Sequence, residues 1–239
     1  MRPVQLLLAV AVLSSCSAGR TYHPAAAPQP VLAPPSGGAT AGSPAFDNDI
    51  AAFEAADRRS PPQPGGVLFV GSSSIRLWPS LADDFPGVRV VQRGFGGSEI
   101  SDVVHYAPRI VLPYRPRLIV FYAGDNDLNA GESPESVLRD YQSFVDLVWQ
   151  TLPGTRIAFV AIKPSGSRWA MVEKMRTANE LIRAYTARDS RLSYVDVFTP
   201  MLGPDGKPRE ELFVADRLHL NEKGYALWRQ ILNPVVNGR

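Results

Sequence analysis

The stretch Val67-Leu68-Phe69-Val70-Gly71-Ser72-Ser73-Ser74 places an unbroken apolar run directly ahead of a glycine and three serines. A strand that is apolar on both faces has to be covered on both sides, which is typical of a parallel sheet. Four further β-rich runs follow along the chain, at residues 88–92, 118–122, 157–162 and 192–197. The sequence therefore predicts a five-stranded parallel sheet that begins with residues 67–70.

Helical patterns separate these runs. The clearest begins with Ser133 as N-cap and Pro134 in the first helical position, and it ends at Leu152-Pro153-Gly154. A second pattern covers residues 171–185, and a last helix follows Asn221 as its cap. Strands that alternate with helices predict a three-layer α/β fold, in which ligands bind beyond the carboxyl ends of the strands. The loops that follow strands are therefore the places to look for chemistry.

The composition excludes several classes of protein. The chain has 239 residues, of which 45% are hydrophobic and 20% charged, so it is not wholly disordered. Its 25 Lys and Arg nearly balance its 23 Asp and Glu, which leaves a net charge of +2 without the basic footprint of a nucleic-acid binder. The single cysteine, Cys16, excludes a disulfide framework or a cysteine zinc site within one chain.

The first 16 residues read as an export signal. Arg2 precedes an apolar run from Leu6 to Leu13, which is too short to span a bilayer. The quartet Leu13-Ser14-Ser15-Cys16 resembles the bacterial lipobox, which implies cleavage before Cys16 and lipid on its thiol. The alternative is an ordinary secretory signal with a chance cysteine.

Residues 17–45 form a compositionally distinct segment, in which 21 of 29 residues are Pro, Ala, Gly or Ser. Such a stretch buries too little apolar surface to offset its ordering entropy, and its prolines keep it extended. We therefore expect a signal and lipobox at 1–16, a disordered tether at 17–45 and a folded domain at 46–239. The expected location is the bacterial cell envelope, as a lipid-anchored periplasmic or outer-membrane protein.

The serine-rich turn at residues 71–74 is the first candidate site. A hydroxyl held on a sharp strand-to-helix turn can act as a nucleophile, and the helix N-terminus favours the negative charge that develops. The same serines could instead only cap the helix. A phosphate-binding loop is also conceivable, but the GxxxxGK[ST] pattern is absent.

Two further loops follow predicted strands. The glycines of residues 94–98 could bring backbone N–H groups close to a ligand, as an oxyanion hole requires, or could serve only a tight turn. In residues 123–127, Asn126 could direct its amide at an oxyanion, unless the loop is an Asx-turn. Asp125 and Asp127 could suggest a metal, but no histidine lies nearby and two near-adjacent carboxylates rarely suffice. We therefore expect no metal.

The chain has three histidines. His23 lies in the tether, and His105 lies in a helical pattern that is typical of a structural histidine. This leaves His219 as the credible general base. Asp216, three residues earlier, could accept a hydrogen bond from the other ring nitrogen and fix the tautomer of the imidazole.

Taken in order, these four loops resemble the blocks of the SGNH hydrolases, also called the GDSL esterase and lipase family. The resemblance extends from Val67 to about Trp228, and residues 68–75 are similar to the first block of its acetylhydrolase-like bacterial members. It implies a three-layer, flavodoxin-like fold. By their places in the motifs, it implies a catalytic set of Ser73, Asp216 and His219 and an oxyanion hole of Ser73, Gly97 and Asn126.

The sequence departs from the family at one position and is ambiguous at another. Ser72 stands where the family usually has Asp, which makes Ser72 and Ser74 rival nucleophiles. In the second block Gly94 and Gly96 compete with Gly97 as the oxyanion donor. Gly97 is preferred because it lies next to a polar residue, as in the family.

The resemblance implies a serine esterase that hydrolyses carboxylic esters through an acyl-enzyme without a metal or cofactor. Its expected substrate is a small-molecule or glycan ester, in particular a short-chain O-acyl group on an envelope glycan. The alternatives are a lysophospholipase or thioesterase of the same family, and a non-enzymatic surface lipoprotein that binds glycan. Trp78, Phe95 and Trp169 lie in or near the loops, where they either line an acyl or sugar site or belong to the core.

Overall fold

A computed structural model of the chain describes residues 46–238. Its five strands form one parallel sheet in the order β2-β1-β3-β4-β5, which is the flavodoxin-like order. The strands are β1 (Val67–Gly71), β2 (Val90–Gly94), β3 (Leu118–Tyr122), β4 (Arg156–Val160) and β5 (Leu192–Val195). The predicted five-stranded parallel sheet is confirmed.

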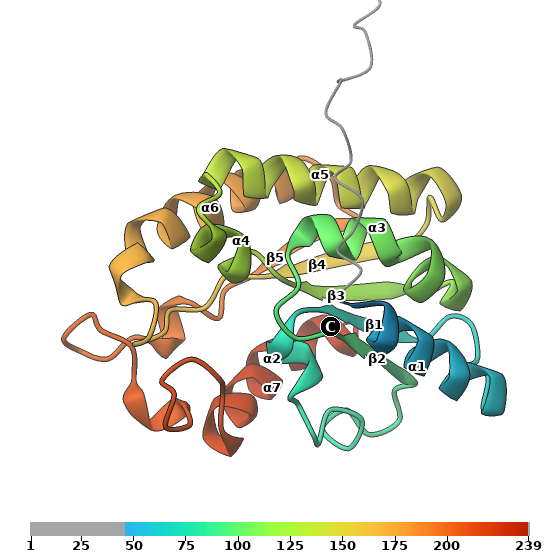
Figure 1. Cartoon of the computed structure of the whole chain (residues 1–239), viewed down its shortest axis with the longest axis horizontal. Coiled ribbons are helices and arrows are strands. Elements are labelled where there is room, and N and C mark those ends of the chain that lie inside the picture. The colour runs from blue at the N-terminus through green and yellow to red at the C-terminus, as the bar shows by residue number, and fades with distance from the viewer. Residues whose placement is uncertain (1–45, 239) are drawn as a thin grey trace, which may run out of the picture. The chain divides into compact units, whose positions relative to one another are not determined.

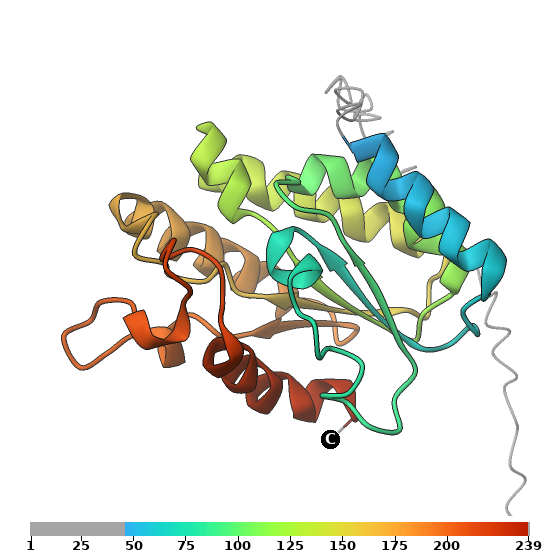
Figure 2. The same cartoon turned by 60° about the horizontal axis from the view of Figure 1, so that its bottom comes forward.

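Helices cover both faces of this sheet (Figures 1 and 2). Over one face lie α3 (Ile100–Ile110), α5 (Pro134–Thr151) and α6 (Val172–Thr186), and α1 (Asp47–Arg59) packs beside α3. On the other face lies α7 (Glu222–Val236). The shorter helices are α2 (Ser73–Arg76), α4 (Asp125–Ala130), η2 (Leu112–Tyr114), η3 (Trp169–Met171), η4 (Thr199–Met201) and η5 (Glu210–Leu212). The layers are those of the predicted three-layer α/β fold.

The burial of the strands follows from their place in the sheet. Every residue of β1 and of β3 is buried, because each strand has a neighbour on both sides and helices above and below. The edge strands β2 and β5 include half-buried residues. Strand boundaries were the less predictable part, since β2 begins two residues later than the sequence run at 88–92 and β4 ends two residues before the end of the run at 157–162.

Aromatic side chains join the sheet to α5. The Phe121 ring is fully buried, and its centroid lies 4.5 Å from that of Phe144 and 5.6 Å from that of Tyr141. Phe159 of the adjacent strand lies 4.8 Å from Tyr141. Burying one such ring stabilises the fold by about 2 kcal/mol, so this contact fixes the helix firmly over β3 and β4.

The helix caps predicted from sequence are present. The Ser133 side chain accepts a hydrogen bond from the backbone N–H of Ser136 at 3.1 Å, at the start of α5. Asn221 accepts from the backbone N–H groups of Lys223 and Gly224 and so caps α7. Because α7 begins immediately after the loop that carries His219, this cap also fixes where that loop ends.

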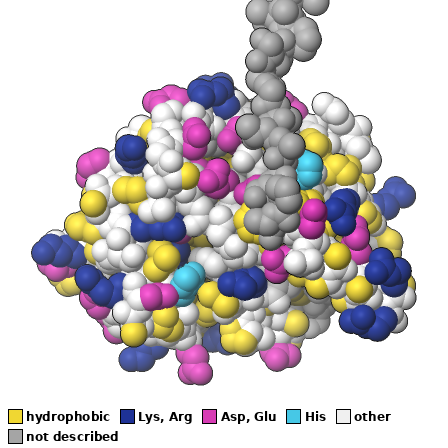
Figure 3. Space-filling view, in the orientation of Figure 1, with side chains coloured by type: hydrophobic (Ala, Val, Ile, Leu, Met, Phe, Trp, Pro, Cys, Tyr) yellow, Lys and Arg dark blue, Asp and Glu magenta, His cyan; other side chains and the backbone are white. Residues whose placement is uncertain are grey.

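The predicted export signal, Cys16 and the tether at 17–45 lie outside the described residues and stay predictions. Within residues 46–238, no helix is long and apolar enough to cross a membrane. On the face shown in Figure 3, acidic and basic side chains are intermixed.

Candidate active site

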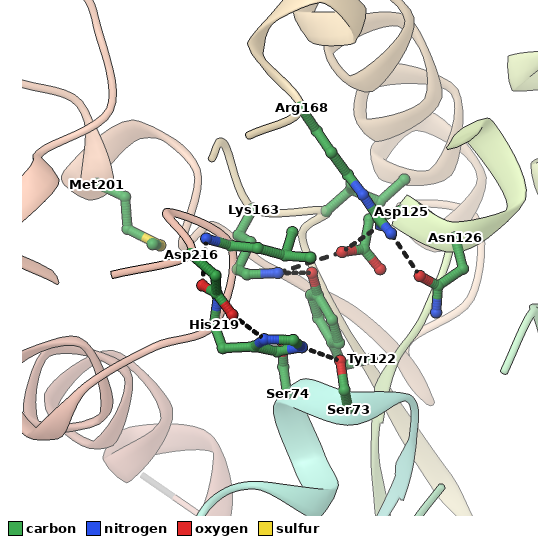
Figure 4. Close-up of polar contacts among 12 residues, drawn as sticks. Ser73, Ser74, Tyr122, Asp125, Asn126, Lys163, Arg168, Met201, Asp216 and His219 are labelled. Carbon is green, nitrogen blue, oxygen red and sulfur yellow. Dashed lines mark hydrogen bonds and ion pairs between the residues drawn. The ribbon is translucent and has the colours of Figure 1, made fainter. Parts of the chain in front are cut away.

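Three side chains from two distant parts of the sequence meet in a hydrogen-bonded row (Figure 4). The Nε2 atom of His219 lies 3.1 Å from Ser73 Oγ, and its Nδ1 atom lies 2.6 Å from Asp216 Oδ2. A histidine placed between a hydroxyl and a carboxylate can take the hydroxyl proton while the carboxylate stabilises the resulting imidazolium. The structure thus brings together the serine, histidine and aspartate that the sequence singled out.

Asp216 is held by its own turn. Its Oδ1 atom accepts hydrogen bonds from the backbone N–H groups of Leu218 at 2.8 Å and of His219 at 2.9 Å. Arg217, which lies between Asp216 and Leu218, has φ +56°. This left-handed conformation lets the chain fold back on the carboxylate of Asp216. Partial burial alone would raise the pKa of Asp216. Hydrogen bonds from these backbone donors and from the His219 ring outweigh that effect and lower the pKa to about 2. The carboxylate therefore stays ionised at neutral pH and keeps Nδ1 as the protonated ring nitrogen.

The turn at Ser73 depends on a glycine. Gly71 has φ +136°, and a Cβ atom there would lie 1.8 Å from the backbone oxygen of Tyr122, so no other residue fits. The chain can then turn so that the Ser72 N–H donates to that same oxygen at 3.0 Å. This contact joins the end of β1 to the end of β3 and starts α2 at Ser73.

The three serines of the turn are not equivalent. Ser72 and Ser74 are each 1% exposed, and among the described residues their hydroxyl groups have no hydrogen-bond partner. Ser73 is half-buried and faces His219. Of the rival nucleophiles, Ser73 alone is therefore placed to give its proton to the histidine.

Two backbone N–H groups in the strand-end loops are candidate donors to a ligand. Within residues 46–238, no backbone oxygen accepts a hydrogen bond from the N–H of Ser73 or of Gly97. Gly97 has φ +88°, and a Cβ atom there would meet nothing within 4 Å, so its backbone faces open space. Gly94 and Gly96 differ, because a Cβ atom at either would collide with Arg76. At Gly94 the obstacle is the backbone of Arg76, so packing explains that glycine, whereas at Gly96 it is only the end of the exposed Arg76 side chain, which can move. The backbone packing removes Gly94 as a rival to Gly97, which has the most open surroundings of the three.

Asn126 lies at the start of α4, and both ends of its amide are engaged. Its Nδ2 atom donates to the backbone oxygen of Ser98 at 2.9 Å. Its Oδ1 atom accepts from Arg168 Nη2 at 2.9 Å (Figure 4). The amide nitrogen carries two hydrogens, and among the described residues the second has no acceptor. Asn126 therefore keeps one donor for a ligand.

Asp127 connects the loop after β3 to the loop after β2 by a hydrogen bond. Its Oδ1 atom accepts from the backbone N–H of Ile100 at 2.9 Å, at the start of α3, while Oδ2 is buried without a hydrogen-bond partner. Burial raises the pKa of Asp127 to about 7. Between residues 46 and 238 no three His, Cys, Asp or Glu side chains are grouped so that they could hold a metal ion.

The structure adds a buried charged cluster that the sequence reading missed. Lys163, just after β4, lies with Nζ 3.2 Å from Asp125 Oδ2 and 3.0 Å from the Tyr122 hydroxyl. Arg168 Nη1 lies 3.0 Å from the same carboxylate oxygen. Burial alone would raise the pKa of Asp125, but the two cations lower it, so the carboxylate is ionised. We call these three charged residues, with Tyr122, the buried charge cluster.

Other sequence candidates take structural roles. Trp78 and Phe95 are fully buried and belong to the core, so neither lines a substrate site. Trp169 in η3 is half-buried next to Arg168. His105 is exposed on α3 with its ring 4.6 Å from that of Tyr106, so it is a surface residue and not an interior structural histidine.

Comparison with known proteins points to one family. The pattern of the GDSL-like Lipase/Acylhydrolase family matches residues 66–227. Platelet-activating factor acetylhydrolase IB subunit alpha1 from Bos taurus is 29% identical over 168 residues, which cover 66% of this chain and 69% of that protein. A GDSL-like lipase from Bacteroides thetaiotaomicron has a similar structure, with a TM-score of 0.68 at 18% identity, over 79% of this chain and 98% of that one. A carbohydrate esterase family 3 protein from Talaromyces cellulolyticus has a TM-score of 0.57 at 16% identity, over 73% and 97%.

Proposed function

The chain belongs to the GDSL-like lipase/acylhydrolase family and is an ester hydrolase, and we propose that it cleaves carboxylic esters through an acyl-enzyme on Ser73. The observation that carries this proposal is the row of contacts from Ser73 Oγ to His219 Nε2, at 3.1 Å, and from His219 Nδ1 to Asp216, at 2.6 Å. Both distances are within the reach that proton transfer requires.

In the first half of the reaction, Ser73 Oγ attacks the ester carbonyl while its proton passes to Nε2 of His219. The ionised Asp216 stabilises the imidazolium that forms. Collapse of the tetrahedral intermediate breaks the bond to the alcohol oxygen, and His219 returns the proton to the departing alcohol. The acyl group is then an ester of Ser73.

In the second half, His219 takes a proton from water as the water oxygen attacks the acyl carbon. The bond to Ser73 Oγ breaks, the serine regains its proton, and the acid is released. The negative oxygen of both tetrahedral intermediates would be held by the backbone N–H groups of Ser73 and Gly97 and by the free amide hydrogen of Asn126.

A fluorophosphonate tests the nucleophile. This reagent reacts with a serine that a base activates, so we expect covalent labelling of Ser73 in the intact protein and no labelling after His219→Ala. Peptide mapping by mass spectrometry identifies the labelled serine. Labelling of Ser72 or Ser74 would overturn the assignment of the nucleophile.

For the substrate we propose a short-chain O-acyl ester, with an envelope glycan as the alcohol. The short acyl group is supported by the relative from Bos taurus, which is named an acetylhydrolase. The glycan alcohol is supported by the proposed export, because an exported protein would meet acylated glycans. The rival substrates are lysophospholipids and thioesters. A panel of p-nitrophenyl esters of increasing chain length, followed by acetylated glycans, lysophospholipid and acyl thioester, compares their kcat/KM values. A maximum at acetate or propionate is expected, and a maximum at long chains would favour the lysophospholipase alternative.

We further propose that Cys16 carries a lipid that anchors the protein to the membrane. A single acyl chain binds a membrane only marginally, whereas several chains anchor a protein stably. Cys16→Ser is expected to move the protein from the membrane fraction to a soluble one, or to block its processing, with the esterase kcat unchanged. Cell fractionation and mass spectrometry of the mature N-terminus measure this. A wild-type protein that is soluble with an unmodified Cys16 would contradict the anchor.

A further inference from the structure

The orientation of the Asn126 amide is fixed from both ends. A guanidinium can only donate hydrogen bonds, so Arg168 can face only the amide oxygen. A backbone carbonyl can only accept, so the Ser98 oxygen can face only the amide nitrogen. The two contacts therefore specify the same one of the two possible amide orientations, which leaves one N–H of Asn126 free.

Arg168 is itself held in place. Its Nη1 atom lies 3.0 Å from Asp125 Oδ2, and its side chain is only 13% exposed. The carboxylate of Asp125 is buried, so moving the guanidinium to solvent would remove one of the two cations that compensate a buried charge. The guanidinium thus contacts Asp125 through one nitrogen and Asn126 through another (Figure 4).

We propose that Arg168 is a positioning residue for the oxyanion hole. It holds the Asn126 amide so that the free N–H is oriented before the negative oxygen forms. This inference rests on the proposed function, since it assumes that Asn126 donates to that oxygen. Arg168 acts through Asn126 and touches no reacting atom.

The planar fork of arginine is essential to this role. A lysine ammonium at position 168 could keep the ion pair with Asp125, but as a single point charge it would not hold the carboxylate and the amide oxygen together. A substitution can therefore keep the positive charge of residue 168 and remove its hydrogen bond to Asn126.

The test is a double-mutant cycle between Arg168 and Asn126 with a short p-nitrophenyl ester. Asn126→Ala is expected to lower kcat by roughly 10²- to 10³-fold, because an oxyanion donor acts mainly in the transition state. Arg168→Met is expected to lower kcat by about tenfold or more, with KM within about twofold of wild type. In the Asn126→Ala background, Arg168→Met should lower kcat by less than about twofold, because the amide that it positions is gone.

Arg168→Lys separates positioning from stability. It should retain a melting temperature close to wild type, because the charge beside Asp125 remains, and yet show a kcat about as low as that of Arg168→Met. Arg183→Met is the matched control, since Arg183 forms an exposed pair with Glu180 on α6, and its kcat should equal that of wild type. The lysine variant also keeps the test usable if Arg168→Met does not fold.

Three results would overturn the inference. One is an equal loss of kcat when Arg168→Met is made in the wild-type and in the Asn126→Ala background, which would show that Arg168 does not act through Asn126. Another is a raised KM with unchanged kcat, which would make Arg168 a substrate contact. The third is full activity of Arg168→Lys, which would show that the positive charge of residue 168 suffices and that its hydrogen bond to Asn126 is not needed. Failure of the proposed function looks different, because Ser73→Ala would then retain activity whatever the Arg168 variants do.

Discussion

Two polar clusters meet at the carboxyl edge of the sheet, and they differ in exposure. In the Ser73–His219–Asp216 row, the side chains of His219 and Asp216 are 27% and 46% exposed. In the buried charge cluster, the side chains of Lys163 and Asp125 are 1% and 6% exposed. The first cluster can exchange protons with substrate and water, whereas the second is shielded from both. The comparison separates groups that substrate and water can reach from groups that they cannot.

The two clusters also depend on charge in different ways. The Asp216 carboxylate is stabilised by backbone N–H groups of its own loop, so it needs no cation. The Asp125 carboxylate is stabilised by two cations from the segment after β4. Removing a residue from the first cluster should therefore change activity. Removing Lys163 from the second should change stability, whereas Arg168, which also contacts Asn126, should affect both.

The largest expected effect is on activity. Ser73→Ala and His219→Ala should each lower kcat by a factor of about 10⁴ or more, because each removes a group that forms or breaks a bond. Their melting temperatures should match that of wild type. Ser143→Ala, on the exposed face of α5, is the control and should retain full activity. A loss of kcat below about tenfold in Ser73→Ala would contradict the division between the two clusters.

The next effect is on stability. Lys163→Met leaves the buried Asp125 with one cation fewer and should lower the free energy of unfolding by about 3 kcal/mol. Urea denaturation followed by circular dichroism measures this loss. The control is Arg183→Met, which breaks an exposed pair and should cost under about 1 kcal/mol. Similar losses in the two variants would show that burial of Asp125 does not raise the cost of losing its cation. Combining Lys163→Met with Asp125→Asn should restore part of the loss.

The smallest expected effect is on the pH dependence of stability, and it concerns Asp127. This residue is buried like Asp125, but among the described residues no cation is paired with it. Its pKa is raised from 3.8 to about 7, so between these values the folded protein binds more protons than the unfolded chain. The free energy of unfolding should therefore fall as pH rises from about 4 to 7. Asp127→Asn should make this decline shallower in urea titrations at pH 5 and pH 8. Identical declines in both proteins would contradict the raised pKa.

The sequence predicted the first cluster better than the second. Ser73, Asp216 and His219 were identifiable because four loops, each ambiguous alone, follow the order of the SGNH hydrolase blocks at the ends of predicted strands. Lys163 and Arg168 were missed, because a basic residue in a loop is usually a solvated one, and Asp125 is 38 residues away from Lys163 in the chain. One signal was available: Lys163 directly follows the apolar run at 157–162, at the edge where the site was expected.

The choice between neighbouring residues also required the structure. Spacing alone could not distinguish Ser73 from Ser72 or Ser74, because the decision depends on which hydroxyl faces His219 after the turn at Gly71. Strand boundaries differed by up to two residues for a similar reason, since they depend on which residues pair across the sheet. The class of fold, by contrast, was fixed by the long-range alternation of strands and helices.

The separation of Ser73 and His219 by 146 positions has a consequence for the order in which the protein is made. The strands are complete at Val195, so a ribosome has delivered the whole sheet before it reaches the histidine. A nascent chain at that stage contains the serine turn but not yet the histidine that faces it. The Ser73–His219 contact can therefore form only after the segment from Asp216 to α7 has been made.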